Sequence, residues 1–266
     1  MHKRKKQVLT IAGSDSGGGA GIQADLKTLS AHNVFGMSVI TSITAQNTKE
    51  VTSVYDLPLS IIEAQLDAVF SDFDIAATKI GMLSNADIVH LVSKKLAQYA
   101  STNLIIDPVM VSKSGHTLLH TDAIDVLKTD LIPKALLITP NIYEAELLAE
   151  TTVKTLADVR QACKTIQTLG CRHVLIKGGH LPDKPAMDVL YDGRFFRMYP
   201  GECIDTPHTH GTGCTYASAI AANLAKGLPL PNAIEASKQY ITAAIRNGLT
   251  IGHGRGPTDH FYFLPE

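Results

Sequence analysis

The apolar residues of this chain gather in short continuous runs that alternate with stretches of amphipathic spacing. Apolar runs of about four to eight residues indicate buried strands, and apolar residues roughly three or four positions apart indicate helices. These patterns predict strands over residues 8–12, 34–43, 77–81, 104–107, 136–139 and 173–177. They predict helices over residues 20–31, 60–70, 86–99, 156–169, 213–225 and 232–247.

Two later apolar runs, residues 187–191 and 194–199, flank the turn-forming pair Asp192-Gly193 and predict a β-hairpin. Alternating strands and helices predict a three-layer α/β sandwich, in which a mostly parallel central sheet carries helices on both faces and the hairpin forms an antiparallel edge. No repeat or linker interrupts the pattern, so we expect one domain over residues 8–266 after a basic tail, residues 1–7. In such sheets ligands bind beyond the carboxyl ends of the strands.

The composition indicates a globular protein and argues against two classes of partner. Hydrophobic residues make up 45% of the 266 residues and charged residues 18%, with a formal net charge of -1. A near-neutral charge argues against a nucleic-acid partner, and no apolar run reaches the roughly 20 residues that span a membrane. The basic cluster at residues 3–6 fits an anionic partner or a targeting signal, but a solvated tail is the simpler interpretation.

The cysteines indicate a reducing compartment. Cys163, Cys171, Cys203 and Cys214 form no Cys-x-x-Cys pair and show no regular spacing. We therefore expect free thiols and a cytoplasmic location. Residues 8–12 are also too short for the apolar core of a secretory signal.

Residues 10–25 combine a strand end, a glycine-rich loop and a helix start. Glycines let backbone N–H groups approach a small ligand closely. The loop lacks the Gly-Lys-Ser/Thr ending of a P-loop, and its glycine spacing does not match a dinucleotide fingerprint. From glycine content alone, a plain tight turn and a binding loop remain equally good interpretations.

The segment His210-Gly211-Thr212-Gly213-Cys214 leads into an apolar helix and is the strongest local signal. Free N–H groups and the positive end of the helix dipole make such a turn an anion site, where a transferring phosphoryl group could be stabilised. Cys214 lies in the first turn, where we expect a lowered thiol pKa. A simple glycine hinge is the alternative, but it leaves His210 and Cys214 unexplained.

Three more polar residues follow predicted strands. Asn141 and Glu144 lie on one face of a first helical turn and are oxygen donors suited to Mg²⁺. The same spacing fits a capping box, which the residues alone favour. Lys177 ends a strand where a phosphate could lie, although an isolated lysine at a strand end is usually just solvated.

Taken together and in this order, these motifs resemble the hydroxymethylpyrimidine/phosphomethylpyrimidine kinases, a ribokinase-like branch that also contains pyridoxal kinases. The resemblance runs nearly end to end through Leu9-Thr-Ile-Ala-Gly-Ser-Asp15, Gly17-Gly-Gly-Ala-Gly-Ile-Gln-Ala-Asp-Leu-Lys27, Thr44-Ala-Gln-Asn-Thr48, Lys79-Ile-Gly-Met-Leu83, Asp107-Pro-Val-Met110, Lys113-Ser-Gly115, Thr139-Pro-Asn-x-x-Glu144, Lys177-Gly-Gly-His180, Thr209-His-Gly-Thr-Gly-Cys214, Gly256-Pro257 and His260. With the resemblance, the functional interpretation of Asn141 and Glu144 outweighs capping.

The resemblance implies a ribokinase-like fold, ATP and Mg²⁺ as cofactors, and a homodimer. It implies ATP-dependent phosphorylation of 4-amino-5-hydroxymethyl-2-methylpyrimidine to the monophosphate and then to the diphosphate, for thiamin biosynthesis. The implied phosphate and metal residues are the anion hole Gly211, Thr212, Gly213 and Cys214, the metal group Asn141, Glu144 and Asp107, and the ATP contacts Lys177, Thr212, Gly211 and Asn141.

The resemblance also implies a substrate pocket. Gln46 would read the pyrimidine, because its amide offers a donor and an acceptor side by side. The implied walls are Gly13, Ala20, Met82 and Val109. Asp25 would lie near the hydroxymethyl group, or would instead be a first-turn carboxylate that stabilises its helix.

Two alternatives stay open. Sugar kinases of the superfamily usually carry aspartate where Cys214 stands, and certain pyridoxal kinases add a lid cysteine where Ser112 stands here. The first difference argues against a sugar substrate, and serine is a much poorer partner than cysteine for the aldehyde of pyridoxal, so pyridoxal is not the favoured substrate. A pyridoxine or pyridoxal kinase stays open as the alternative, and a non-catalytic pyrimidine-binding protein is a weaker one. For the main function, a Cys214 thiolate is the hypothetical general base of the first step; the monophosphate, largely ionised near neutrality, needs none.

Overall fold

The structure is a computed structural model that describes residues 5–110, 121–178 and 186–265. The predicted lid serine, Ser112, and residues 3 and 4 of the basic cluster lie outside the described residues.

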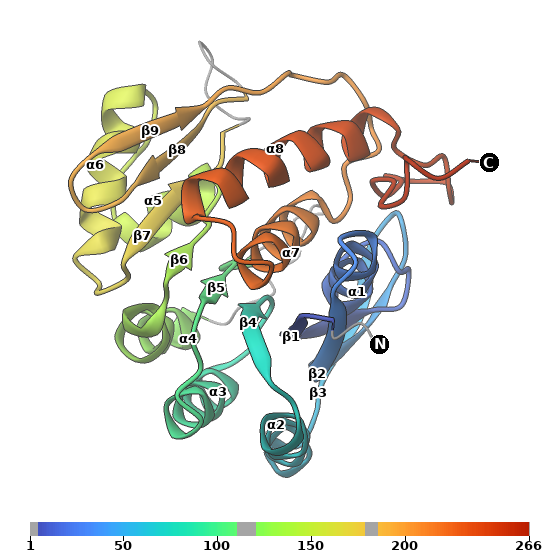
Figure 1. Cartoon of the computed structure of the whole chain (residues 1–266), viewed down its shortest axis with the longest axis vertical. Coiled ribbons are helices and arrows are strands. Elements are labelled where there is room, and N and C mark those ends of the chain that lie inside the picture. Colours follow the sequence, from blue (N-terminus) through green and yellow to red (C-terminus); the bar gives the residue numbers. More distant parts are fainter. Residues whose placement is uncertain (1–4, 111–120, 179–185, 266) are drawn as a thin grey trace.

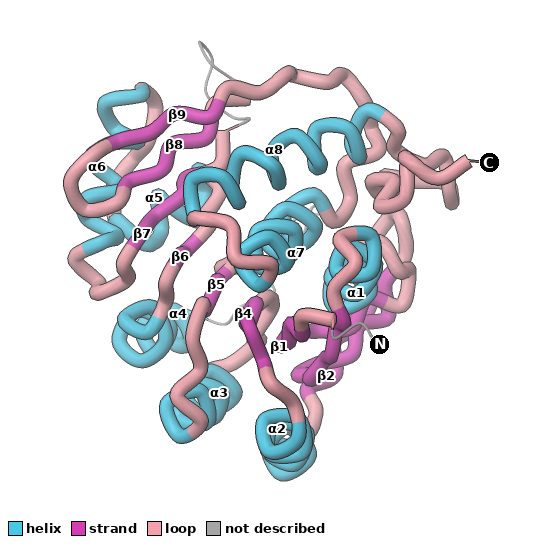
Figure 2. The backbone as a smooth tube through the Cα atoms, in the orientation of Figure 1, coloured by secondary structure: helices cyan, strands magenta, loops and turns pink. Residues whose placement is uncertain are grey.

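A single twisted sheet runs through the described part of the chain, with strand order β3-β2-β1-β4-β5-β6-β7-β8-β9 (Figure 2). Six strands pair in parallel: β1 (Gln7–Asp15), β2 (Phe35–Gln46), β4 (Ile75–Ile80), β5 (Leu104–Ile106), β6 (Leu137–Ile138) and β7 (His173–Ile176). The antiparallel strands are β3 (Val51–Asp56) at one edge and β8 (Asp188–Tyr191) with β9 (Phe196–Tyr199) at the other.

Helices cover both faces of the sheet (Figure 1). One face carries α1 (Gly21–Ala31), α7 (Thr212–Ala225) and α8 (Leu230–Arg246). The other carries α2 (Leu59–Asp72), α3 (Ala86–Gln98), α4 (Thr121–Val126), α5 (Ile142–Ala149) and α6 (Leu156–Gln167). Helix α4 continues through a π-helical turn, Leu127–Leu131, and a 3₁₀ turn, Ile132–Lys134.

The two helical layers create two hydrophobic cores. In β5, Ile105 packs into the core beneath α7 and α8, whereas Leu104 and Ile106 pack into the core on the opposite face. A parallel strand covered on both faces is apolar at consecutive positions. This double burial explains why the strands read as continuous apolar runs in the sequence.

The predicted three-layer fold is confirmed, and each predicted strand and helix is present with boundaries shifted by a few residues. Strand β3 was missed, because only Val51 of its six residues is buried and no apolar run marks it. The sheet consequently has two antiparallel edges instead of the one predicted. The hairpin loop is longer than a two-residue turn, since β8 ends at Tyr191 and β9 begins at Phe196; within the loop, Asp192 accepts hydrogen bonds from the amides of Arg194 and Phe195.

None of the helices in the described ranges combines the length and apolar character needed to cross a lipid bilayer.

Candidate active site

A cavity of about 620 Å³ opens at the carboxyl ends of the parallel strands. Residues at or just after the ends of consecutive strands line it, as expected for an open α/β sheet. The predicted residues that line it are Gly13, Ala20, Gln46, Met82, Asp107, Val109, Asn141, Glu144, Lys177, Gly211, Thr212, Gly213 and Cys214. The structure thus brings together every predicted site residue except Asp25.

The start of α7 forms one side of the cavity. Gly211 is the residue before the helix and has φ of 77°, a left-handed conformation that favours glycine. A Cβ on Gly211 would also collide with the carbonyl oxygen of Gly19, so the two glycine loops touch. The Thr212 amide and hydroxyl both donate to the Thr209 carbonyl, at 3.4 and 2.7 Å. Of the first-turn amides, those of Gly213 and Cys214 are therefore the better anion donors.

An ion pair faces this helix start. Lys177 Nζ lies 2.6 Å from Asp107 Oδ1, and a Cβ added to Gly213 would lie 3.4 Å from both side chains. Burial acts to lower the pKa of Lys177, but the charges of Asp107 and Glu144 outweigh it and raise that pKa. Lys177 therefore carries a fixed positive charge next to the open end of α7.

Asn141 and Glu144 form the capping box that their spacing allows, and their metal role stays a prediction. Asn141 Oδ1 accepts from the Glu144 amide at 2.9 Å, and Glu144 Oε2 accepts from the Asn141 amide at 2.8 Å, which is a complete capping box. Both residues also line the cavity. Burial raises the pKa of Glu144 to about 7, a rise that Lys177 opposes and Asp107 reinforces.

The donors present fit Mg²⁺ only if it also binds water and phosphate oxygens. Within the described residues, no three His, Cys, Asp or Glu side chains gather into a metal cluster. Two carboxylates, Asp107 and Glu144, share the cavity. Because Mg²⁺ usually keeps several waters and binds through one or two carboxylates plus substrate phosphates, these residues suit it better than a metal caged by protein alone.

Cys214 corrects one expectation. Burial raises the pKa of its thiol to about 11, and the nearby positive charge of Lys79 only partly opposes this. The predicted lowering by the helix start is therefore wrong for this structure. The side chain lines the cavity as a neutral thiol. The backbone amide of Gly21 also acts to lower the pKa of this thiol, but burial outweighs it.

Asp25 is the second correction. Its carboxylate is completely buried and accepts hydrogen bonds from Lys79 (2.9 Å), Thr10 (2.6 Å) and Ser218 (2.7 Å). It is not among the residues that line the cavity, so the structure offers no contact between Asp25 and a hydroxymethyl group bound there. It also lies beyond the first turn of α1, which begins at Gly21 and has no acidic residue there, so the second interpretation is wrong as well.

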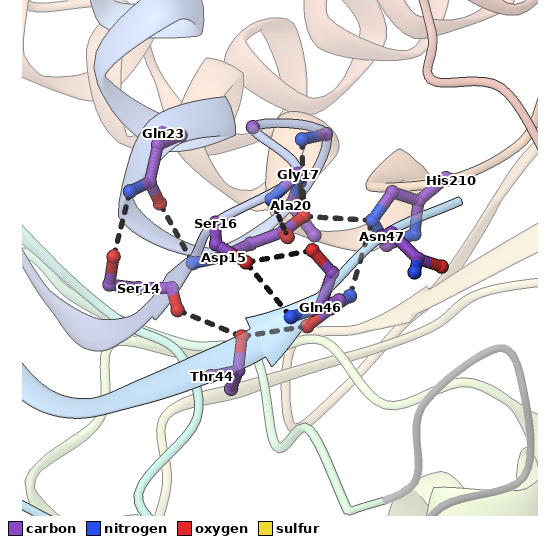
Figure 3. Close-up of polar contacts among 12 residues, drawn as sticks. Ser14, Asp15, Ser16, Gly17, Ala20, Gln23, Thr44, Gln46, Asn47 and His210 are labelled. Atoms are coloured by element: carbon purple, nitrogen blue, oxygen red, sulfur yellow. Dashed lines mark hydrogen bonds and ion pairs between the residues drawn. The ribbon is translucent and has the colours of Figure 1, made fainter. Parts of the chain in front are cut away.

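Lys79, Asp15 and Thr44 are polar groups to which the sequence assigned no role in the site, and His210 was noted there only as unexplained by a glycine hinge. Lys79 stands inside an apolar strand, and a charge at such a position requires a buried partner. Asp15 and His210 come from the two glycine loops and meet each other beside Gln46 (Figure 3). The sequence does mark Asp15 and His210, because each is the one strongly polar residue at the edge of a glycine-rich turn.

Comparison with known proteins identifies the family. The family model for phosphomethylpyrimidine kinase matches residues 15–259. A hydroxymethylpyrimidine/phosphomethylpyrimidine kinase from Haemophilus influenzae is 49% identical over 263 residues, which cover 97% of this chain and 97% of that protein.

Two solved structures share the fold. A phosphomethylpyrimidine kinase from Clostridium difficile 630 is 47% identical with a TM-score of 0.82, covering 91% of this chain and 100% of that one. The ADP complex of Bacillus subtilis pyridoxal kinase is 42% identical with a TM-score of 0.91, covering 98% and 99%. The resemblance noted in the sequence is thus confirmed, together with the ribokinase-like fold: this chain belongs to the phosphomethylpyrimidine kinase family.

Proposed function

We propose that this chain transfers the γ-phosphoryl group of ATP to 4-amino-5-hydroxymethyl-2-methylpyrimidine, and then phosphorylates the monophosphate to the diphosphate. One observation carries the proposal: an amide suited to a pyrimidine, a glycine-rich helix start and a lysine–aspartate pair share one cavity of about 620 Å³. A cavity of this size is typical of small-molecule sites. As the family resemblance implies, the diphosphate would serve thiamin biosynthesis.

At the phosphate end, the amides of Gly213 and Cys214 and the Lys177 ammonium would hold the transferring group. Preorganised donors of this kind stabilise the charge that spreads over the phosphoryl oxygens in the transition state. Thr212 and Asn141 would contact other ATP oxygens. Asp107 and Glu144 would hold Mg²⁺, which supplies charge neutralisation at the phosphates when bound. The ADP complex of the B. subtilis relative supports nucleotide binding in this fold.

At the substrate end, Gln46 would hydrogen-bond to the ring nitrogen and the exocyclic amino group, and Gly13, Ala20, Met82 and Val109 would pack around the ring. The hydroxymethyl group would then face Cys214. A thiol with a pKa of about 11 is protonated at neutral pH, so we withdraw the thiolate-base hypothesis. In a loose transition state the alcohol proton leaves late, which makes little demand on a strong base.

A pyridoxal kinase remains a second candidate for one reason: the B. subtilis pyridoxal kinase shares 42% of its residues with this chain and the same fold. Two relatives that carry the hydroxymethylpyrimidine name, from H. influenzae and B. subtilis, are more similar in sequence, at 49% and 47%. Phosphorylation of pyridoxal is therefore proposed only as a side activity.

The experiment that tests the proposal is a mass-resolved assay. The chain is incubated with Mg-ATP and either the hydroxymethylpyrimidine or pyridoxal, and products are separated by mass. The proposal expects a mono- and then a diphosphate of the pyrimidine, with no product when EDTA removes Mg²⁺. Exclusive phosphorylation of pyridoxal would favour the second candidate, and ATP-independent binding without product would favour a binding protein.

The proposal extends to assembly and location. Four apolar side chains remain exposed near the β2–β3 edge and the start of α2: Ile43 and Tyr55, which pair across the two strands, and Leu59 and Ile61. A homodimer through this edge would cover them, and sedimentation of the purified chain tests it. A cytoplasmic location fits the free thiols at Cys163, Cys171, Cys203 and Cys214. A single catalytic domain over residues 8–266 is likewise proposed, although β1 already begins at Gln7.

A further inference from the structure

The two glycine loops meet at a buried carboxylate. Asp15 accepts hydrogen bonds from the amides of Gly17 (2.8 Å), Gly19 (3.1 Å) and Ala20 (2.8 Å), and from His210 Nε2 at 2.9 Å (Figure 3). Burial acts to raise the pKa of Asp15, but the contact with His210 and the backbone amides outweigh it and lower that pKa. The carboxylate is therefore ionised and acts only as an acceptor.

This carboxylate determines the tautomer of His210. An acceptor-only group 2.9 Å from Nε2 requires that Nε2 carries the hydrogen, in both the neutral and the charged ring. The ring is also held in place. A Cβ on Gly19 would collide with it, and the His210 backbone pairs on both sides, donating to the Gly256 carbonyl at 3.1 Å and accepting from the Thr258 amide at 3.3 Å. His210 thus presents a fixed N–H donor.

His210 Nε2 also lies beside the side-chain amide of Gln46. Gln46 Nε2 is 3.3 Å from His210 Nε2, so two donors face each other, while Gln46 Oε1 is 3.0 Å from Thr44 Oγ1. The Thr44 hydroxyl also lies 2.9 Å from the Ser14 carbonyl, which can only accept. A half-turn of the amide removes this clash: the single Nε2–H of His210 is then shared, as a three-centre bond, between Asp15 Oδ2 and Gln46 Oε1, while Gln46 Nε2 donates to Thr44 and Thr44 donates to Ser14.

We propose that His210, oriented by Asp15, is a positioning residue that fixes which way round the Gln46 amide faces the cavity, with its oxygen on the His210 side and its nitrogen on the Thr44 side. His210, Thr44 and Gln46 all line the cavity. The amide keeps one lone pair and one N–H for a ligand, in a defined order.

This order selects the ligand and its orientation, an inference that rests on the proposed function. A pyrimidine with an amino group next to a ring nitrogen binds with the amino group donating to the amide oxygen, on the His210 side. An analogue with an oxo group and a ring N–H at those positions meets acceptor against acceptor and donor against donor. It could bind only if the amide turned, and turning would leave the His210 donor facing an N–H group. Groups left unpaired in this way are the basis of strong discrimination between isosteres.

The test compares kcat/KM for the amino substrate and for its 4-oxo analogue. The wild-type chain should prefer the amino substrate by about 100-fold or more. His210→Leu removes the donor and frees the amide, so the preference should fall at least about tenfold, whereas His210→Gln keeps an N–H group and should preserve most of it. His253→Leu, at an exposed position outside the cavity, is the matched control and should leave the preference unchanged.

The outcomes separate the two proposals. No turnover of the amino substrate by the wild-type chain would overturn the proposed function itself. Turnover with an unchanged preference in His210→Leu would overturn only the role of His210. A second measurement needs no variant activity: ¹⁵N spectra of the histidine-labelled wild-type chain should show a protonated Nε2 for the signal that disappears in His210→Gln. A signal typical of protonation at Nδ1 alone would contradict the inference even if His210→Leu failed to fold.

Discussion

Two lysine–aspartate pairs lie close to the start of α7, and they differ in their access to the cavity. Lys79 and Asp25 are both 0% exposed and are further bonded by Thr10 and Ser218. Lys177 is 14% exposed, and it lines the cavity with Asp107. The same chemical pair therefore serves two purposes. The enclosed pair holds β4 to α1 and α7, while the open pair offers its charge to a ligand.

The largest expected effect concerns the enclosed pair. Lys79→Met leaves the Asp25 carboxylate buried without its counter-charge, which should lower the free energy of unfolding by about 3–5 kcal/mol. Urea denaturation measures it. Adding Asp25→Asn should recover much of the loss, because no charge is then left unpaired. A single variant as stable as the wild type would remove the distinction between the pairs.

The open pair should respond in activity more than in stability. Lys177→Met removes a donor at the transferring phosphate, and kcat/KM should fall by about 100–1000-fold. Its free energy of unfolding should fall by less than that of Lys79→Met, since Asp107 borders the cavity, whereas Asp25 does not. Steady-state kinetics and urea denaturation of the same preparation check both parts. A loss of stability as large as that of Lys79→Met would contradict the comparison.

A buried histidine, His260, should make the free energy of unfolding depend on pH below neutrality. Burial lowers the pKa of His260, which bonds to Thr215 in α7, from its ordinary value near 6.5 to about 4. The unfolded chain therefore binds more protons than the folded chain between these values. Stability should fall as pH drops from 6.5 to 4, by up to about 1.4 kcal/mol per pH unit for this group.

A variant isolates that contribution. His260→Gln should show a shallower loss of unfolding free energy over the same pH interval in urea titrations. His32, whose pKa burial also lowers to about 4, remains in the variant and should preserve part of the slope. Parallel pH profiles for the variant and the wild type would show that the His260 imidazole is not an enclosed group.

The smallest effect is expected at Cys214, which lies between the two pairs. Cys214→Ser keeps a small neutral donor and acceptor, so the rates of both phosphorylation steps should fall by less than about tenfold. Single-turnover assays of each step measure this. A loss of several hundredfold confined to the first step would restore the thiolate base that the raised pKa argues against.

The sequence predicted the layers of the fold and most of the cavity for one physical reason. Strands buried on both faces are continuous apolar runs, so their ends, and the polar residues that follow, such as Asn141 and Lys177, stand out. Strand β3 escaped notice because its exposed residues form no such run. The resemblance to a family added Gln46 and Asp107, which no local pattern distinguishes.

What could not be predicted depends on contacts between distant segments. Asp25 lies 54 positions before Lys79, and only the folded sheet shows that this carboxylate is bonded to Lys79 in the interior and does not line the cavity. The pKa of Cys214 depends on burial that a helix position does not specify. The meeting of Asp15 with His210 spans 195 positions.

A crystal structure with the hydroxymethylpyrimidine and a non-hydrolysable ATP analogue tests the central claim most directly. The account predicts the γ-phosphate within hydrogen-bond distance of the Gly213 amide and Lys177 Nζ, and the pyrimidine amino group on the oxygen of Gln46. Asp25 and Lys79 should touch neither ligand. A nucleotide whose phosphates avoid the Gly211–Gly213 turn, or a pyrimidine bound outside the cavity, would contradict it.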